Sequence, residues 1–256
     1  MLGSIIRACS RHGYDLLVSF QDLLRDWHAD YEDTHKADGI ILLGYGDYVV
    51  HRSRLEALIA QGAHIVRWGP VQPEQPGASI GCDNVFGGRL AADHLVAIGR
   101  RRIAFLGEIV PSSPEVSGRY RGYRAALADA GVAADPRLQA GAISTEASGY
   151  EAMQALLERR VPFDAVFGAS DLIAIGAMTA LASAGRRVPE DIALVGFDGI
   201  PMGAFTRPAL TTVAQDTKRA GQLLVQTLIH LIEGKPAKGV ILPPRLIVRD
   251  SCGGCG

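Results

Sequence analysis

Short apolar runs rich in β-branched residues alternate with segments of helical spacing along most of this chain. Each run is typical of a strand buried on both faces, because it lacks the regular polar residues of a half-exposed strand. Such alternation predicts an α/β fold in which parallel strands form doubly wound sheets with helices on both faces. The expected strands are 15–19, 39–43, 64–68, 103–107, 165–168 and 192–196, and the expected helices are 52–61, 85–98, 117–130, 148–158, 171–184 and 217–233.

Glycines mark the ends of the expected helices. A glycine readily takes the left-handed backbone conformation that often ends a helix, so its position helps to locate the turn toward the next strand. The glycines that directly follow helical segments in this way are Gly62, Gly99, Gly131, Gly185 and Gly234.

Length and composition indicate two lobes. The chain has 256 residues, which exceeds the usual size of one domain, and 48% of them are hydrophobic, enough for two modest cores. No low-complexity linker or internal repeat is visible. We therefore expect the lobes to be joined by crossing strands rather than by a flexible tether.

The first residues follow helical spacing, with apolar side chains at Leu2, Ile5, Ile6 and Cys9. A doubly wound lobe normally opens with a strand that lies centrally in its sheet. We therefore expect Met1 to be an internal start and the first lobe to lack its first strand. The strands at 15–19 and 39–43 would then flank an empty slot.

Charge, cysteine content and hydropathy exclude several classes of protein. Lys and Arg number 26 against 27 Asp and Glu, so the net charge of −1 gives no global attraction to nucleic acid or membrane. Cys252 and Cys255 lie in a glycine-rich tail without a second pair, which favours a frayed tail of reduced thiols over a metal site. Neither a secretory signal nor an apolar run of membrane-spanning length is visible, so we expect a cytoplasmic protein.

Signatures of enzymes are weak. The segment 168–172 lacks the second glycine of a nucleophile elbow, and neither a phosphate-binding loop nor a dinucleotide motif is present. The seven histidines show no metal-ligand spacing. The sequence predicts neither catalytic residues, nor a cofactor, nor a metal site.

Polar and aromatic residues follow the expected strands. In open α/β sheets, ligands bind beyond the carboxyl ends of the strands, where loops converge. Carboxylates and amides there could bind the hydroxyls of a sugar-like ligand, while aromatic rings stack on its C–H face. The residues at these positions are Arg67, Asp83, Asn84, Ser170, Asp171 and Asp198, with Tyr45, Trp68, Phe86 and Phe205 as aromatic surfaces.

Arg119 opens a helical segment and could present its rigid donor fork to paired hydroxyls or a carboxylate. Structural roles are the alternatives for these candidates. Arg119 could form a surface salt bridge, Asp171 could cap its helix, and Trp68 could belong to the core.

Two long motifs resemble a known family. The segment 188–198 has the sequence Val-Pro-Glu-Asp-Ile-Ala-Leu-Val-Gly-Phe-Asp, and 208–216 has Pro-Ala-Leu-Thr-Thr-Val-Ala-Gln-Asp. Their order and spacing resemble the effector-binding region of the LacI/GalR transcription regulators, and the resemblance extends from Met1 to about Ser251. The segment 168–178 also resembles the family, except that Ser170 stands where these regulators usually have asparagine.

The resemblance implies a periplasmic-binding-protein type I architecture. The first lobe would comprise 1–101 plus 217–242, and the second 102–216 plus 243–256. A small polar effector, a sugar or related metabolite, would bind in the cleft between them. The implied contacts are Arg119, Asp198 and Ser170, accompanied by Asp171, Asp83, Trp68, Tyr45, Phe86 and Gln215.

The family also implies partners. Its members begin with a helix-turn-helix head, which this sequence lacks, so operator DNA would be reached only through a missing head, and pairing of first lobes would give a homodimer. A periplasmic sugar-binding protein of a transporter is the main rival, although the Pro-Ala-Leu-Thr-Thr run at 208–212 favours the regulator. An enzyme on a doubly wound fold and a scaffold without ligand are further alternatives.

Overall fold

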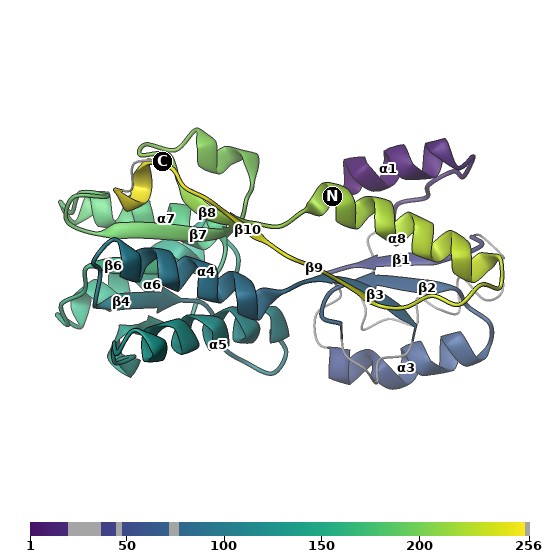
Figure 1. Ribbon diagram of the computed structural model, residues 1–256, viewed down its shortest axis with the longest axis horizontal. Helices are drawn as coiled ribbons and strands as arrows, with labels where there is room; N and C mark the ends of the chain where they lie inside the picture. Colours follow the sequence, from purple (N-terminus) through teal and green to yellow (C-terminus); the bar gives the residue numbers. More distant parts are fainter. Residues whose placement is uncertain (20–36, 45–47, 72–76, 254–256) are drawn as a thin grey trace. The chain divides into compact units, whose positions relative to one another are not determined.

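The chain divides into two compact units (Figure 1). The computed structural model describes residues 1–19, 37–44, 48–71 and 77–253. Unit 1 comprises Met1–Cys82 and Asp216–Leu242, and unit 2 comprises Asp83–Gln215 and Pro243–Gly256.

Unit 1 is a parallel sheet covered by helices on both faces. Its strands follow the order β1-β2-β3-β9. Figure 1 shows α1 and α8 on one face of this sheet and α3 on the other. The elements are α1 (Leu2–Arg11), β1 (Ile40–Leu43), α3 (Tyr48–Ala60), β2 (Ile65–Trp68), β3 (Ala78–Cys82), α8 (Thr217–Ile232) and β9 (Val240–Leu242).

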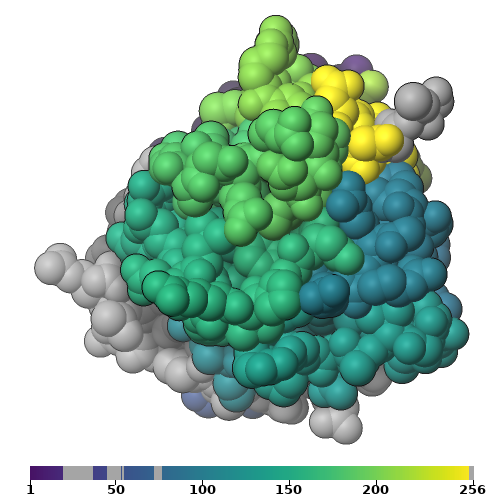
Figure 2. All heavy atoms as spheres, turned by 90° about the vertical axis from the view of Figure 1, so that its left-hand side faces the viewer, coloured from purple at the N-terminus to yellow at the C-terminus, as the bar shows by residue number. Residues whose placement is uncertain are grey.

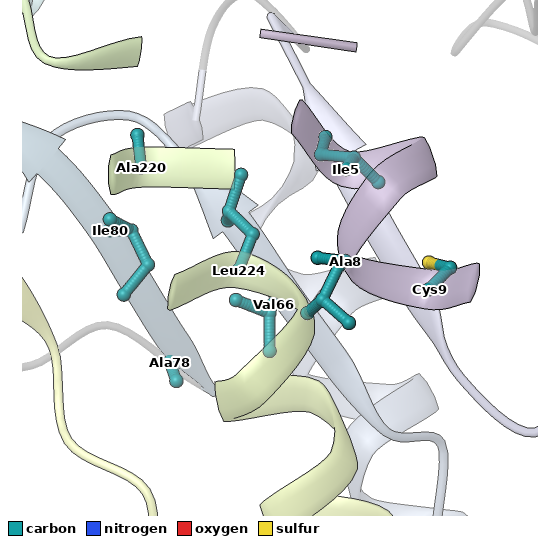
Figure 3. Packing of buried hydrophobic residues seen from close by; sticks show 9 residues of the cluster. Ile5, Ala8, Cys9, Val66, Ala78, Ile80, Ala220 and Leu224 are labelled. Carbon is teal, nitrogen blue, oxygen red and sulfur yellow. The ribbon is translucent and has the colours of Figure 1, made fainter. Parts of the chain in front are cut away.

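The strands of unit 1 bury both faces, as expected from their continuous apolar runs. Side chains alternate along a strand, so Ile65 packs with α3 while Val66 packs with α1 and α8 on the opposite face. The core on the second face, shown in Figure 3, consists of Ile5, Ala8, Cys9, Val66, Ala78, Ile80, Ala220, Leu224 and Val225.

Unit 2 is a larger sheet with the strand order β10-β8-β7-β6-β4-β5. Only β10 is antiparallel to its neighbour. The chain passes from β4 outward to β5 and then returns to β6 on the other side of β4, so the strand order reverses there. The strands are β4 (Ile103–Leu106), β5 (Gln139–Ala140), β6 (Ala165–Gly168), β7 (Ala193–Asp198), β8 (Thr211–Ala214) and β10 (Arg245–Ile247).

Glycines allow the helices of unit 2 to pack closely in pairs. A side chain at Gly122 on α5 would overlap the carbonyl of Val85 on α4, and one at Gly176 on α7 would overlap the carbonyl of Glu146 on α6. The backbones of each pair therefore touch directly. The helices are α4 (Asn84–Ala97), α5 (Pro114–Asp129), α6 (Glu146–Glu158) and α7 (Asp171–Ser183), with short 3₁₀ turns η1 (Pro136–Leu138), η2 (Pro201–Ala204) and η3 (Asp250–Cys252).

The structure confirms the fold class and the expected helices. The five helix-ending glycines all have positive φ angles, between 65° for Gly131 and 97° for Gly62. The expected strand at 15–19 is wrong, because these residues form no strand and pair with none in the described part of the chain, and Leu17 is 65% and Val18 49% exposed. The strands β3, β5, β8, β9 and β10 were not among those expected from apolar runs.

The division into units differs from the expected boundary after residue 101. Helix α4 belongs to unit 2, because it packs against α5 and the larger sheet. The close contact between these two helices at Gly88 and Gly122 explains the difference.

The expectation of a frayed C-terminal tail is wrong for Cys252. This residue is 1% exposed and its sulfur lies 3.0 Å from Nε2 of His94 on α4. The neighbouring Ser251 hydroxyl donates to the Leu194 carbonyl at 2.6 Å. Figure 2 shows this end of the chain, in yellow, beside the blue segment that includes α4. Cys255 lies outside the described residues.

No helix in the described part of the chain is both long and apolar enough to cross a membrane.

Candidate functional site

Three of the predicted site residues meet at the carboxyl edge of the unit 2 sheet. Arg119 lies on the second turn of α5, Asp198 ends β7, and Gln215 follows β8. Oδ1 of Asp198 accepts a hydrogen bond from Nε2 of Gln215 at 2.7 Å and lies 3.5 Å from Nη2 of Arg119. The structure thus joins a cation, a carboxylate and an amide in one cluster, which we call the Arg119 cluster.

Arg119 is held firmly, and the alternative of a surface salt bridge is wrong for it, because the residue is only 6% exposed. Its Nε donates to Oδ1 of Asn84 at 2.9 Å, and its Nη1 donates to the carbonyl of Ala169 at 2.5 Å. The guanidinium carbon lies 3.7 Å from the centre of the Phe197 ring, within the range of a cation–π interaction. Arg119 lies on α5, which follows β4, and Ala169 directly follows β6. Their hydrogen bond therefore connects the loops at the place where the strand order reverses.

Asp198 has a rarely occupied backbone conformation, and the pKa of its carboxyl group is shifted. Its φ angle of 111° lies in a region that L residues rarely occupy, and Gly199 follows with a φ of 74°. Such conformations persist where surrounding structure enforces them, and they are frequent at functional sites. Burial raises the pKa of Asp198, while Arg119 and the hydrogen bond from Gln215 oppose that rise. The side chain of Asp198 is still 30% exposed, so it is accessible to a ligand.

Ser170 and Asp171 are occupied by internal hydrogen bonds. The Ser170 hydroxyl caps α7 by accepting from the backbone N–H of Ile173 at 3.2 Å. Asp171 is fully buried, and its two carboxylate oxygens accept from the Thr212 hydroxyl at 2.6 Å and from the Ile200 backbone N–H at 2.7 Å. The helix cap is therefore Ser170 rather than Asp171, and both side chains face the protein interior.

The other predicted residues are spread more widely. Asp83 caps α4 by accepting from the backbone N–H of Phe86 at 2.9 Å, and Phe86 itself is 43% exposed. Trp68 ends β2 in unit 1 and packs against the core beside α1 and α8. Tyr45 lies outside the described residues. Of these residues, Asp83 and Phe86 belong to unit 2 with the Arg119 cluster.

Four contacts of the site were not identified as such from the sequence. Asn84 and Ala169 accept from Arg119, Phe197 lies beneath its guanidinium, and Thr212 donates to Asp171. The pair Asp83-Asn84 signals a polar helix start, but only the fold shows that Asn84 approaches Arg119. The described residues contain no group of three or more His, Cys, Asp or Glu side chains that could hold a metal ion.

Asp171 is expected to make stability depend on pH. Burial raises its pKa from 3.8 to about 6, against the opposing hydrogen bonds from Thr212 and Ile200. The folded state then binds a proton more tightly than the unfolded state. The stabilisation of the folded state by the protonated carboxyl is fully present below about pH 4 and is lost as the pH rises through about 6, by on the order of 3 kcal/mol.

Chemical denaturation at several pH values between 4.5 and 7.5 measures this effect. The Asp171→Asn variant has a side chain that cannot ionise. As the pH rises, its free energy of unfolding should therefore increase relative to that of the unchanged protein. A constant difference between the two proteins over this range would contradict the assignment.

Comparison with known proteins places these features in context. Residues 92–252 match the model of a periplasmic binding protein-like domain. The HTH-type transcriptional regulator CelR of Thermobifida fusca is 39% identical over 183 residues, which cover 70% of this chain and 53% of CelR. The HTH-type transcriptional repressor PurR of Mannheimia succiniciproducens is 30% identical over 259 residues, covering 98% of this chain and 76% of PurR. The chain thus matches about half the length of CelR and three quarters of PurR.

Solved structures of transcription regulators are also similar to this chain. A complex of the transcriptional regulator CelR with cellobiose has a TM-score of 0.86 at 31% identity, covering 98% of this chain and 77% of that one. The transcriptional repressor AscG of Escherichia coli has a TM-score of 0.82 at 29% identity, covering 98% of this chain and 92% of that one.

Proposed function

We propose that this chain, which belongs to the LacI/GalR family of transcription regulators, binds a small polar effector and thereby controls the DNA binding of a regulator. The Arg119 cluster at the carboxyl edge of the unit 2 sheet is the observation on which this proposal rests. A buried arginine, a partly exposed carboxylate and an amide meet there, at a position where open α/β sheets bind ligands.

The chemistry of this cluster suits a polyhydroxylated ligand. A hydroxyl group both donates and accepts, so it can donate to Asp198 and accept from Arg119 at the same time. Arg119 is already fixed by Asn84 and Ala169, so little side-chain entropy is lost when a ligand binds. A sugar or related metabolite is therefore the proposed effector class, and the cellobiose bound by the related CelR structure is an example of that class.

The remaining predicted contacts divide into three groups. We propose Gln215 as a further contact because it is part of the Arg119 cluster, and Asp83 and Phe86 because they belong to the same unit as that cluster. Trp68 and Tyr45 stay predictions as aromatic contacts. Ser170 and Asp171 influence effector binding indirectly, by holding the residues around the cluster in place, because their side-chain oxygens accept hydrogen bonds from groups of the protein itself.

Effector binding changes DNA affinity only if the effector binds one arrangement of the regulator more tightly than another, with typical couplings of about 1 to 3 kcal/mol. The net charge of −1 gives no general attraction to DNA, so we propose that operator contact requires a helix-turn-helix head. Cytoplasmic location and assembly as a homodimer are further parts of this proposal. The curated relatives are transcription regulators, which favours this function over a sugar-binding protein of a transporter or an enzyme.

A thermal-shift screen tests the proposal. Monosaccharides, disaccharides, nucleosides and amino acids are added at millimolar concentration, and a specific ligand raises the apparent melting temperature by mass action. We expect a sugar to raise it in a concentration-dependent manner.

Two variants make the screen specific for the Arg119 cluster. Asp198→Asn should weaken the shift by removing the charged acceptor. Asp191→Asn should leave the shift intact, because Asp191 pairs with Arg187 at the surface. The absence of any stabilising compound, or an equal shift in the Asp198→Asn variant, would overturn the proposed function.

A further inference from the structure

Asp198 lies at a sharp turn that a buried hydrogen-bond network holds in place. The backbone passes through two consecutive residues with positive φ, Asp198 and Gly199, directly after β7. Gly199 tolerates this conformation, whereas Asp198 is disfavoured in it and needs external support. That support has to come from contacts to the backbone that follows.

The two backbone N–H groups after Asp198 both find partners in the network. The N–H of Gly199 donates to the Thr212 hydroxyl at 3.3 Å, and the N–H of Ile200 donates to Oδ2 of Asp171 at 2.7 Å. The Thr212 hydroxyl in turn donates to Oδ1 of Asp171 at 2.6 Å. One fully buried carboxylate thus fixes the turn directly through Ile200 and indirectly through Thr212.

Strand β7 leaves space for this carboxylate. Gly196 on β7 pairs with Thr212 on β8, and a side chain at Gly196 would overlap Oδ1 of Asp171. The absence of a side chain at this position gives Asp171 access from α7 to the turn. A buried carboxylate is unfavourable without partners, and here both oxygens are satisfied by the turn and the strand beside it.

We infer that Asp171, together with Thr212, is a positioning residue that sets the orientation of Asp198 toward Arg119 without touching the effector itself. This inference deepens the proposed function and rests on it for the role of Asp198. It differs from the expectation that Asp171 is an effector contact. It also explains why a glycine occupies position 196, where a side chain would overlap the carboxylate of Asp171.

Amide hydrogen exchange in the full chain tests the positioning role without any ligand. Asp171→Leu removes both acceptors, and Thr212→Val removes the hydroxyl with little change of shape. Exchange at Ile200 in the first variant and at Gly199 in the second should become at least about tenfold faster, while the helices of unit 2 keep their protection.

Conservative variants provide the rescue. Asp171→Asn can still accept from Ile200, and Thr212→Ser keeps the hydroxyl, so both should retain slow exchange at the turn. Asp191→Leu is the matched control, since it removes a carboxylate that also accepts a backbone N–H in unit 2, from Arg187, but lies before β7, at the opposite end of that strand from the turn. Unchanged exchange at Gly199 and Ile200 in folded Asp171→Leu and Thr212→Val would overturn the inference.

A binding measurement then connects the turn to the effector. With cellobiose as the probe, calorimetry should show affinity at least about tenfold weaker for Asp171→Leu and Thr212→Val, and near the unchanged value for Thr212→Ser. Equal affinities in all variants despite faster exchange at the turn would also overturn it. Failure of the proposed function is distinguishable, because the unchanged chain would then bind no compound of the thermal screen, while the exchange experiment still decides whether Asp171 holds the turn.

Discussion

Replacing Gly122 by alanine should destabilise unit 2 by about 3 kcal/mol, a large fraction of the stability of an ordinary domain. The new methyl group would overlap the carbonyl oxygen of Val85 on α4, and its second-nearest neighbour is the backbone nitrogen of Arg89. Backbone atoms cannot move aside by a change of rotamer, so α4 and α5 would have to separate. Denaturation followed by far-ultraviolet circular dichroism measures the loss.

Gly141→Ala is the matched control. Gly141 lies in unit 2 with nothing within 4 Å of an added methyl group, and its φ angle is not positive. This variant should be neutral or slightly stabilising, by up to about 1 kcal/mol, because alanine reduces the freedom of the unfolded chain. Equal stability of the two variants would show that the close helix contact tolerates a side chain.

The contact at Gly122 also matters for the site. Arg119 lies one turn earlier on the same helix, and its partner Asn84 begins α4. Separation of the two helices would therefore move the arginine away from the group that orients it. Stability and effector affinity should fall together in Gly122→Ala, whereas Gly141→Ala should lower neither.

Periodicity predicted the helices because each carries its own signal within a few turns. Gly99 and Gly131, for example, end helices where the pattern stops, and both have the positive φ that this role requires. Strands gave a weaker signal. The apolar segment at 15–19 has the composition of a strand but no strand pairs with it among the described residues, while Ala78–Cys82 contains a serine, a glycine and a cysteine and yet forms β3. Pairing with neighbouring strands, which is not visible in a local pattern, decides such cases.

The contacts around Arg119 could be predicted only in part for the same reason. Arg119 and Asp198 were predicted as partners in one site, and the structure places their side chains 3.5 Å apart. Ser170 and Asp171 were placed at the correct edge of the sheet, but their hydrogen-bond partners come from residues up to 41 positions away, as for Asp171 and Thr212. Sequence alone shows that a polar side chain follows a strand. Only the fold shows whether its acceptors are already satisfied.

Replacing Arg119 by alanine should reduce effector affinity by at least about a hundredfold, which corresponds to about 2.7 kcal/mol. The guanidinium uses three different nitrogens for Asn84, Ala169 and Asp198, so its position is fixed before the effector arrives. Its removal takes away the cation opposite Asp198 and leaves two acceptors without their donor. The pKa of Asp198, already raised by burial, should rise further because the lowering effect of Arg119 is lost.

Calorimetric titration with the sugar identified by thermal shift measures the affinity, and near-ultraviolet circular dichroism shows whether the fold is kept. Arg119→Lys separates charge from geometry, since lysine restores a cation but cannot make the three directed contacts of the guanidinium. Its affinity should lie between those of the alanine variant and the unchanged protein. Arg89→Ala is the control, because Arg89 on α4 forms its ion pairs, among the residues that the structure describes, with the exposed Asp93 and Asp129. Wild-type affinity in a folded Arg119→Ala protein would remove Arg119 from the effector site, and with it the reason for placing that site at this edge of the sheet.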